Sequence, residues 1–249
     1  MATHLALAFH RKEVNVTQIV SRSRLAGERL ARKVKAGYND DFAVAGLQAD
    51  LFILAVSDSA IEEVSRNLKP DNRLVVHTSG SVDMQVLSGA SSNIGVFYPL
   101  QTFSKDHRIN FSNIPVCIEA SSAENEEKLI QLARLISKKV QPLSSAQRKV
   151  LHMTAVFAGN FSSFMYTIAE DLLKKHDIPF SLLKPLISQT ASLARHEDVF
   201  SRQTGPAVRG DSKTMEEHLE MLARHGVYME IYDLISKSII KHKRRNDEL

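Results

Sequence analysis

Two short apolar runs constrain the fold of this chain more than any other feature. They occupy residues 51–56 (LFILAV) and 74–76 (LVV), and polar residues bound each of them. Such runs are typical of strands that are buried on both faces of a parallel sheet and covered by helices. We therefore expect an α/β fold.

The rest of the first 145 residues alternates strand and helix patterns. The two runs predict strands at residues 51–56 and 74–77. Further strands are expected at residues 15–20, 94–97 and 116–119 and near Val140. Helices are expected at residues 3–11, 25–36, 59–67 and 124–138. Strands that alternate with helices form βαβ units and an open sheet.

The pattern changes near residues 142–145, and from Gln147 onward only helical periodicity remains. Helices are expected at residues 148–175, 180–195, 213–223 and 227–242, with breaks at residues 177–179 and 203–206. We predict two domains, an α/β domain of residues 1–144 and an all-helical domain of residues 145–249.

Composition excludes several classes of protein. Apolar residues make up 43% and charged residues 24%, which excludes a disordered or collagen-like chain. No run approaches the ~18 apolar residues of a membrane helix, so we expect no membrane partner. The single cysteine, Cys117, fits a reducing compartment, and we expect a cytoplasmic protein. No metal-ligand spacing is present, so no metal is expected.

The net charge of +4 comes largely from residues 237–245. This stretch is interpretable as a solvated helix end or as a basic tail that binds nucleic acid. We favour the first, because no aromatic residue is interleaved with the charges, and expect no nucleic-acid partner.

The beginning of the sequence is unusual for a sheet that binds dinucleotides. Such a sheet opens with a strand, a glycine-rich turn and a helix, whereas residues 1–6 already read as the first turn of that helix. The missing strand would be central, so residues 15–20 and 51–56 would be unpaired along facing edges. We expect the sequence to be truncated, or numbered from an internal methionine, or to lack the phosphate-binding turn.

Several motifs resemble one known family. They are ATHL at residues 2–5, SRS at 21–23, HTSGS at 77–81, GVFYPLQTF at 95–103, QR at 147–148, HMTAVF at 152–157, NF at 160–161 and TGPAVR at 204–209. They resemble the Rossmann-like NADP oxidoreductases that carry a C-terminal domain of unknown function. More distantly, the layout is similar to pyrroline-5-carboxylate reductase and to 6-phosphogluconate dehydrogenase-like enzymes.

The resemblance implies a Rossmann-like parallel sheet, incomplete at its N-terminus, followed by a helical domain that forms a homodimer. It also implies NADP as cofactor and a small-molecule substrate. Members of this kind would carry Gly-x-Gly-Asn just before Ala2, and this sequence departs from them there.

The residues after the strand at 15–20 are candidates for binding the adenosine ribose. Ser21, Arg22 and Ser23 lie there, and small hydroxyls beside an arginine favour a 2′-phosphate over a free hydroxyl. The alternative is a polar turn in which Ser23 caps the next helix.

Two further strand ends carry candidate cofactor-binding residues. Val56 and Ser57 end one buried strand, and Thr78 and Ser79 follow the next, where small side chains permit a close approach of the backbone. His77 is interpretable as a proton donor or, more often for a lone histidine at a strand end, as a structural hydrogen-bonding group.

Tyr98, His152 and Asn160 are the candidate catalytic residues. Pro99 stiffens the turn after Tyr98, whose hydroxyl could polarise a substrate carbonyl. The alternative is that the Tyr98 ring only fills space between the domains. His152 and Asn160 share one helical face with Val156, which stands where dehydrogenase relatives have a lysine. His152 is therefore the preferred acid or base, with a satisfied core histidine as the alternative.

Gln101 and Arg209 are the candidate substrate-binding residues. Gln101 lies in the stiffened turn after Tyr98, and Arg209 lies with Asp211 in a Gly-Pro loop that could hold an anionic group. An Arg209–Asp211 pair at a dimer interface is the alternative.

Together these features predict an NADP-dependent oxidoreductase. It would transfer a hydride between NADPH and a small, anionic carbonyl, imine or hydroxyl substrate. The alternative is a non-catalytic nucleotide-sensing or scaffold dimer, which the missing lysine and the missing glycine turn both favour.

Overall fold

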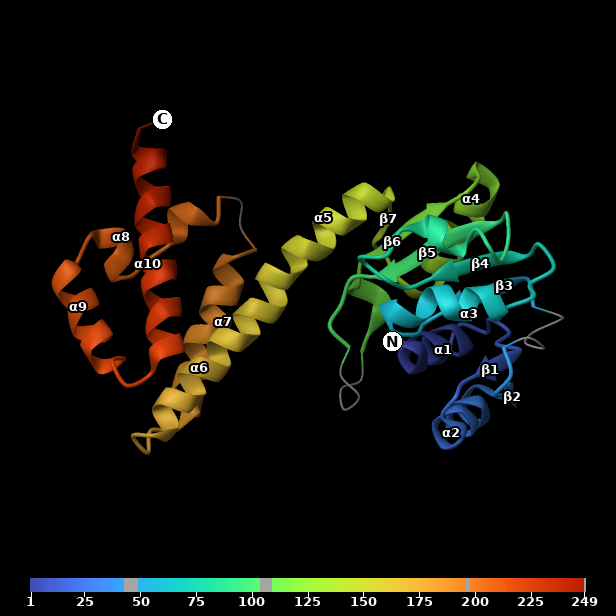
Figure 1. Cartoon of the computed structure of the whole chain (residues 1–249), viewed down its shortest axis with the longest axis horizontal. Helices are drawn as coiled ribbons and strands as arrows, with labels where there is room; N and C mark the ends of the chain where they lie inside the picture. The colour runs from blue at the N-terminus through green and yellow to red at the C-terminus, as the bar shows by residue number, and fades with distance from the viewer. Residues whose placement is uncertain (43–48, 104–108, 196–197, 249) are drawn as a thin grey trace. The chain divides into compact units, whose positions relative to one another are not determined.

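The computed structural model describes residues 1–42, 49–103, 109–195 and 198–248. They form two compact units, Met1–Phe161 and Ser162–Leu249 (Figure 1). No helix among these residues is both long enough and apolar enough to cross a membrane.

The main sheet of the first unit has five strands in the order β3-β4-β5-β6-β7. The strands are β3 (Leu51–Leu54), β4 (Leu74–His77), β5 (Ile94–Pro99), β6 (Val116–Ala120) and β7 (Val140–Pro142). Neighbouring strands are parallel except β5 and β6, which are antiparallel. The predicted α/β fold with a mainly parallel sheet is confirmed.

A second, two-stranded parallel sheet lies in the same unit. It consists of β1 (Gln18–Val20) and β2 (Gly37–Asn39). Strand β2 was not predicted from the sequence, because Gly-Tyr-Asn is short and carries no alternating apolar pattern. Since β1 and β3 belong to different sheets, the expectation that residues 15–20 and 51–56 do not pair with each other is confirmed for the described strands.

Helices cover both faces of the main sheet. They are α1 (Ala2–His10), α3 (Ile61–Asn67), α4 (Ala123–Ile136) and α5 (Ser145–Ala155), whereas α2 (Arg24–Val34) packs on β1 and β2. Phe97 of β5 packs with Phe9 and Leu129 in one apolar cluster, whereas Val96 packs with Ile61 in another. Alternate strand residues therefore enter different clusters, which is why these strands read as continuous apolar runs.

Short 3-10 helices connect several of these elements. In the first unit they are η1 (Asp58–Ala60), η2 (Met84–Leu87) and η3 (Phe111–Asn113), and in the second unit η5 (Phe180–Leu183) and η6 (Phe200–Arg202).

The long helix predicted at residues 148–175 is not uniformly α-helical. Helix α5 is followed by a π-helical turn, η4 (Val156–Phe161), and then by α6 (Ser162–Lys174). The structure changes from strands to helices near residue 144, as expected, but the compact units divide between Phe161 and Ser162. The reason is that α5 buries Arg148 within the first unit.

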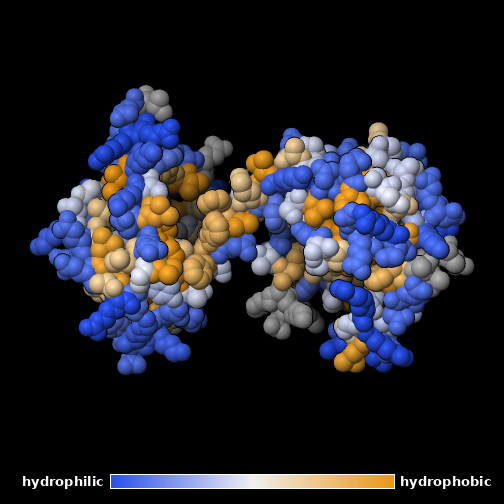
Figure 2. Space-filling model, in the orientation of Figure 1, coloured by the Kyte–Doolittle hydropathy of each residue, from blue (hydrophilic) through white to orange (hydrophobic). Residues whose placement is uncertain are grey.

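The second unit is all-helical, as predicted. After α6 come α7 (Lys184–Leu193), α8 (Pro206–Arg209), α9 (Ser212–Met221) and α10 (Gly226–Asp247). The Tyr228 hydroxyl of α10 donates to Asp171 of α6 at 2.7 Å. Among the described residues of this unit only Ala207 is buried, and large apolar residues reach the surface of the unit (Figure 2).

Candidate functional site

The turn after β4 forms the centre of the candidate site. It comprises Thr78, Ser79, Gly80 and Ser81, at the carboxyl end of a strand that lies between β3 and β5. Thr78, Ser79 and Gly80 are buried, and the Thr78 N–H donates to the carbonyl of Leu54 at 3.2 Å. Carboxyl ends of parallel strands are where open α/β sheets bind ligands.

Tyr98 and His152 meet beside this turn. The Tyr98 hydroxyl and His152 Nδ1 lie 3.1 Å apart and form a hydrogen bond, and the two rings pack edge to face. Burial raises the pKa of Tyr98 to about 12, so its phenol keeps its proton at neutral pH. Two of the three predicted catalytic residues, from β5 and α5, therefore form one pair.

Gly80 makes this pair possible. A Cβ atom at Gly80 would lie 2.6 Å from His152 Nδ1 and 2.7 Å from Tyr98 Cζ, which is closer than real Cβ contacts. Only a glycine lets the turn approach both rings at once.

Hydroxyl groups and one carboxylate line the outer side of the same turn. The Ser81 hydroxyl donates to Asp58 Oδ2 at 2.6 Å, and the Ser79 hydroxyl accepts from the N–H groups of Ser81 and Val82 at 3.1 Å each. Asp58 and Ser81 are exposed, so this edge presents an acceptor and small donors to solvent.

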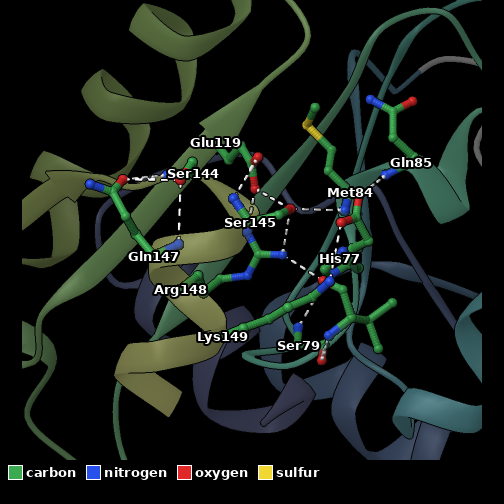
Figure 3. Close-up of polar contacts among 12 residues, drawn as sticks. His77, Ser79, Met84, Gln85, Glu119, Ser144, Ser145, Gln147, Arg148 and Lys149 are labelled. Atoms are coloured by element: carbon green, nitrogen blue, oxygen red, sulfur yellow. Dashed lines mark hydrogen bonds and ion pairs between the residues drawn. The ribbon is translucent and has the colours of Figure 1, made fainter. Parts of the chain in front are cut away.

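A buried ion pair fixes α5 beneath the site. Arg148 is 1% exposed, and its guanidinium pairs with Glu119 of β6 and donates to the carbonyl of Val82 and to the Ser145 hydroxyl (Figure 3). Glu119 also accepts from the N–H and the hydroxyl of Ser145 at 2.8 Å each. Arg148 precedes His152 by one helical turn, so the ion pair sets the position of the His152 side chain.

His77 has a structural role. It is fully buried, and its Nδ1 accepts a hydrogen bond from the Ser79 N–H at 3.1 Å. Burial lowers the pKa of His77 to about 4, with a further contribution from the positive charge of Arg148. The imidazole is therefore neutral at pH 7 and holds the turn in place, in agreement with the structural interpretation of this residue.

The candidate ribose-binding residues follow β1. The Ser23 N–H donates to the Ser21 hydroxyl at 3.2 Å, and Ser23 is the N-cap residue of α2 without a side-chain capping bond. Arg22 and Ser23 are exposed. Val56 and Ser57, at the end of β3, are exposed as well.

The remaining predicted residues are not brought to the Tyr98–His152 pair by any described contact. The side-chain oxygen of Gln101, Oε1, accepts a hydrogen bond from the Thr102 N–H at 2.9 Å. This oxygen is therefore bonded within its own turn. Asn160 is exposed and lies in the π-helical turn, where the α-helical spacing that related it to His152 no longer holds.

Arg209 belongs to the second unit, at the end of α8. The proposed Arg209–Asp211 ion pair does not occur among the described residues. The carboxylate of Asp211 instead caps α9, accepting from the N–H of Thr214 at 3.1 Å and from its hydroxyl at 2.8 Å.

Four residues of the site were not predicted from the sequence: Asp58, Gly80, Glu119 and Arg148. A signal existed for Arg148, since it lies four residues before His152 on a predicted helix. For Glu119 and Asp58 no signal existed, because their partners are distant in the sequence.

Burial raises the pKa of the Cys117 thiol, which suits a small apolar residue rather than a nucleophile. No group of three or more His, Cys, Asp or Glu side chains that could bind a metal occurs within the described part of the chain.

Comparisons with known proteins identify the family. The family model described as "Domain of unknown function (DUF2520)" matches residues 114–239. A solved structure from Bacteroides fragilis, named "putative NADP oxidoreductase", is 41% identical. The match covers 96% of this chain and 94% of that one, with a TM-score of 0.90.

Two more distant structures share the fold. A protein from Thermotoga maritima is 19% identical, with 97% of this chain and 96% of that one covered and a TM-score of 0.79. An imine reductase from Myxococcus stipitatus, solved with NADP⁺, is 15% identical, with coverages of 98% and 91% and a TM-score of 0.67. No curated protein matches the chain significantly.

Proposed function

Because this chain belongs to the DUF2520 family, we propose that it is an NADP-dependent oxidoreductase, the activity for which its relative from Bacteroides fragilis is named. The resemblance inferred from the sequence motifs agrees with this family and with its Rossmann-like fold. The substrate we propose is a small, anionic molecule with a carbonyl, imine or hydroxyl group.

The hydrogen bond between Tyr98 and His152 is the observation that carries this proposal. The Tyr98 phenol keeps its proton at neutral pH, so it can donate to a substrate oxygen or nitrogen. His152, bonded to the same hydroxyl, can restore or accept that proton. When bound, NADPH supplies the hydride, and the protein contributes orientation and proton transfer.

The residues around the sheet edge fit parts of this cofactor. Exposed hydroxyls at Ser57 and Ser81, with buried Thr78 and Ser79, suit ribose and nicotinamide contacts at the ends of β3 and β4. Arg22 is exposed at the end of β1 with no ion pair to another described residue, which leaves its guanidinium available for a 2′-phosphate. No glycine precedes Gly27 in the sequence, so residues 1–26 carry no glycine-rich turn for the pyrophosphate.

Calorimetric titration of NADPH and NADH into the intact chain tests the cofactor. We expect NADPH to bind more tightly than NADH. Arg22→Leu should weaken NADPH binding by about 10- to 100-fold, the value of a charged hydrogen bond of ~1.5–3 kcal/mol, and should change NADH binding little. Arg29→Leu is the matched control, because Arg29 is an exposed arginine on the adjacent helix α2.

The titration also separates the enzyme from the alternative function. If both nucleotides bind equally, the role of Arg22 is wrong. If neither nucleotide binds, the oxidoreductase proposal fails, and a non-catalytic scaffold that uses the same fold takes its place.

Substrate contacts are proposed for Gln101 and Arg209, and a catalytic role is proposed for Asn160. Arg209 offers the positive charge that an anionic substrate needs. Asn160 offers an exposed amide in a π-helical turn, a type of turn that often occurs at functional sites.

We also propose that the chain forms a homodimer through its second unit. Four large apolar residues of this unit, Leu182, Leu186, Val227 and Leu234, are each more than half exposed. Ala207 is the only buried residue among those described in the unit. A helical unit without its own core gains stability when a second copy covers such residues. The free thiol of Cys117 supports a reducing, cytoplasmic location.

A further inference from the structure

A second pocket in the first unit is lined by the C-terminal ends of two helices. It has a volume of about 470 Å³, and its walls come from the end of α1, from residues 109–112 and from the end of α4. None of the candidate-site residues that the structure describes lines this pocket. It is therefore a separate feature of the first unit.

Four of the lining residues are cations, two from each helix end. Arg11 and Lys12 follow α1, whereas Arg134 lies in the last turn of α4 and Lys138 just after it. All four side chains are exposed, and the lining residues that the structure describes include no Asp or Glu. We call this feature the basic pocket.

The four cations are unpaired within the described part of the chain. None of them forms an ion pair or a side-chain hydrogen bond with another described residue. Elsewhere in α4, Lys128 pairs with Glu124 at 2.7 Å. The sequence explains the difference, because no carboxylate lies three or four residues from any of the four cations.

The helix ends account for only part of this positive charge. Cations are favoured at a helix C-terminus, where the helix dipole places about −0.5 of an elementary charge. Two helix ends therefore contribute about −1, against the four positive charges of the basic pocket. A surplus of about three positive charges remains, for which the described lining residues supply no counter-charge.

Neutral hydrogen-bond donors lie in the same wall. The side-chain oxygen of Asn110 accepts from the Ser112 N–H at 3.0 Å. The amide N–H groups of Asn110 and the hydroxyl of Ser112 have no partner among the described residues. An oxyanion in the basic pocket would therefore meet both charged and neutral donors, a combination that suits phosphate.

We propose that the basic pocket binds a small molecule that carries two linked phosphate groups. Each helix end supplies two cations, which can bind one phosphate group through charge-assisted hydrogen bonds. Two phosphate groups carry about three negative charges, which matches the surplus. The pocket volume lies within the ~300–1,000 Å³ that is usual for small-molecule sites. This proposal does not depend on the oxidoreductase activity.

A small molecule suits the basic pocket better than a nucleic acid. The four cations line one concavity, whereas a nucleic-acid surface carries its cations along a stripe or a helix face. Phe111 is the one aromatic residue among the described lining residues, and it is 6% exposed. It therefore offers no ring face on which a base could stack.

Calorimetric titration of inorganic pyrophosphate into the intact chain tests the basic pocket. We expect pyrophosphate to bind at least tenfold more tightly than orthophosphate, because its two phosphate groups can bind the cations of both helix ends. In NMR spectra, the amide signals of Ser112 and Lys138 should shift when pyrophosphate binds. Those of Thr78 and Ser79, in the candidate site, should not.

A double substitution gives the second arm of the test. Arg134→Gln combined with Lys138→Gln should weaken pyrophosphate binding at least tenfold. The control is Arg32→Gln combined with Lys33→Gln, which removes two exposed cations from the last turn of α2, outside the pocket, and should leave binding unchanged. Thermal unfolding shows whether each variant is folded. If the first variant unfolds, Arg11→Gln combined with Lys12→Gln replaces it.

Three results would overturn the proposal. Equal binding of pyrophosphate and orthophosphate, or unmoved signals of Ser112 and Lys138, would show that no diphosphate site exists here. An equal loss of binding in the two double variants would show that only the overall charge matters. Binding of single-stranded RNA that pyrophosphate does not displace would identify a nucleic-acid surface instead.

Titration of NADPH distinguishes this proposal from the proposed activity. If NADPH displaces pyrophosphate, the pocket holds part of the cofactor, and the separate site is refuted. If NADPH binds the wild-type chain and pyrophosphate does not, only the basic pocket fails and the oxidoreductase proposal stands. Failure of NADPH to bind, with pyrophosphate bound, would have the opposite meaning.

Discussion

Gly80 is the residue on which the Tyr98–His152 hydrogen bond depends most directly. Because a Cβ at this position would lie within 3 Å of both rings, Gly80→Ala must displace one of them. We expect a loss of ~1–3 kcal/mol in the free energy of unfolding, typical of overpacking, and a change in the NMR signals of the His152 imidazole.

Gly89→Ala is the matched control for this prediction. Gly89 lies between η2 and β5, and nothing lies within 4 Å of its Cβ position, so its variant should change stability by less than about 0.5 kcal/mol. Equal effects of the two substitutions in urea denaturation would show that Gly80 does not set the geometry of the pair.

His77 should make the stability of the protein depend on pH. Its pKa is about 4 in the folded state and 6.5 in the unfolded state, so the unfolded chain binds a proton first as the pH falls. The neutral imidazole contributes fully to the free energy of unfolding above pH 6.5. About 3 kcal/mol of this free energy is lost as the pH falls from 6.5 through 4.

The comparison of His77→Asn with the wild type isolates this effect. Asparagine keeps an acceptor for the Ser79 N–H but does not titrate, so the stability difference between the two proteins should change between pH 7 and pH 4. His176→Asn, at an exposed histidine, should follow the wild type at every pH in urea titrations. A constant difference between wild type and His77→Asn would contradict the buried, neutral state.

At the scale of elements, Arg148 anchors α5 to the sheet. Arg148→Met leaves the largely buried Glu119 without its charged partner, and breaking such a pair costs ~3–5 kcal/mol. We expect this loss in chemical denaturation and faster amide exchange throughout α5.

Lys149→Met is the control on the same helix. The Lys149–Asp83 pair spans 3.2 Å, and both of its side chains are 48% exposed, so solvent screens it and its loss should cost less than ~1 kcal/mol. If the two variants lose the same stability, Arg148 contributes no more than a surface charge.

At the scale of the whole molecule, the exposed apolar residues of the second unit predict a dimer. Leu186→Glu combined with Leu234→Glu should convert a dimer into monomers in sedimentation experiments, because charges would be buried at the interface. Leu25→Glu with Leu135→Glu, at exposed leucines of the first unit, should leave the dimer intact. A wild-type protein that sediments as a monomer at micromolar concentration would refute the homodimer.

The sequence determined the elements whose pattern is local. Strand β4 was predicted at its observed bounds, and the predicted helix at residues 124–138 corresponds to α4, because apolar periodicity records which faces are buried. The sequence also predicted, from the order of the elements, that β1 and β3 do not pair with each other. The candidate residues Tyr98 and His152 were found in the same way, from a stiff turn and a helical face.

Only the tertiary structure decided which residues meet. The Arg148–Glu119 pair, the approach of Gly80 to two rings and the burial of His77 join segments that are separated along the chain, and no local pattern encodes such contacts. The π-helical turn at residues 156–161 also departs from the α-helical spacing that the sequence favours. Periodicity reports the face that a residue occupies, whereas long-range packing decides its partner, and the chemistry of this site depends on partners.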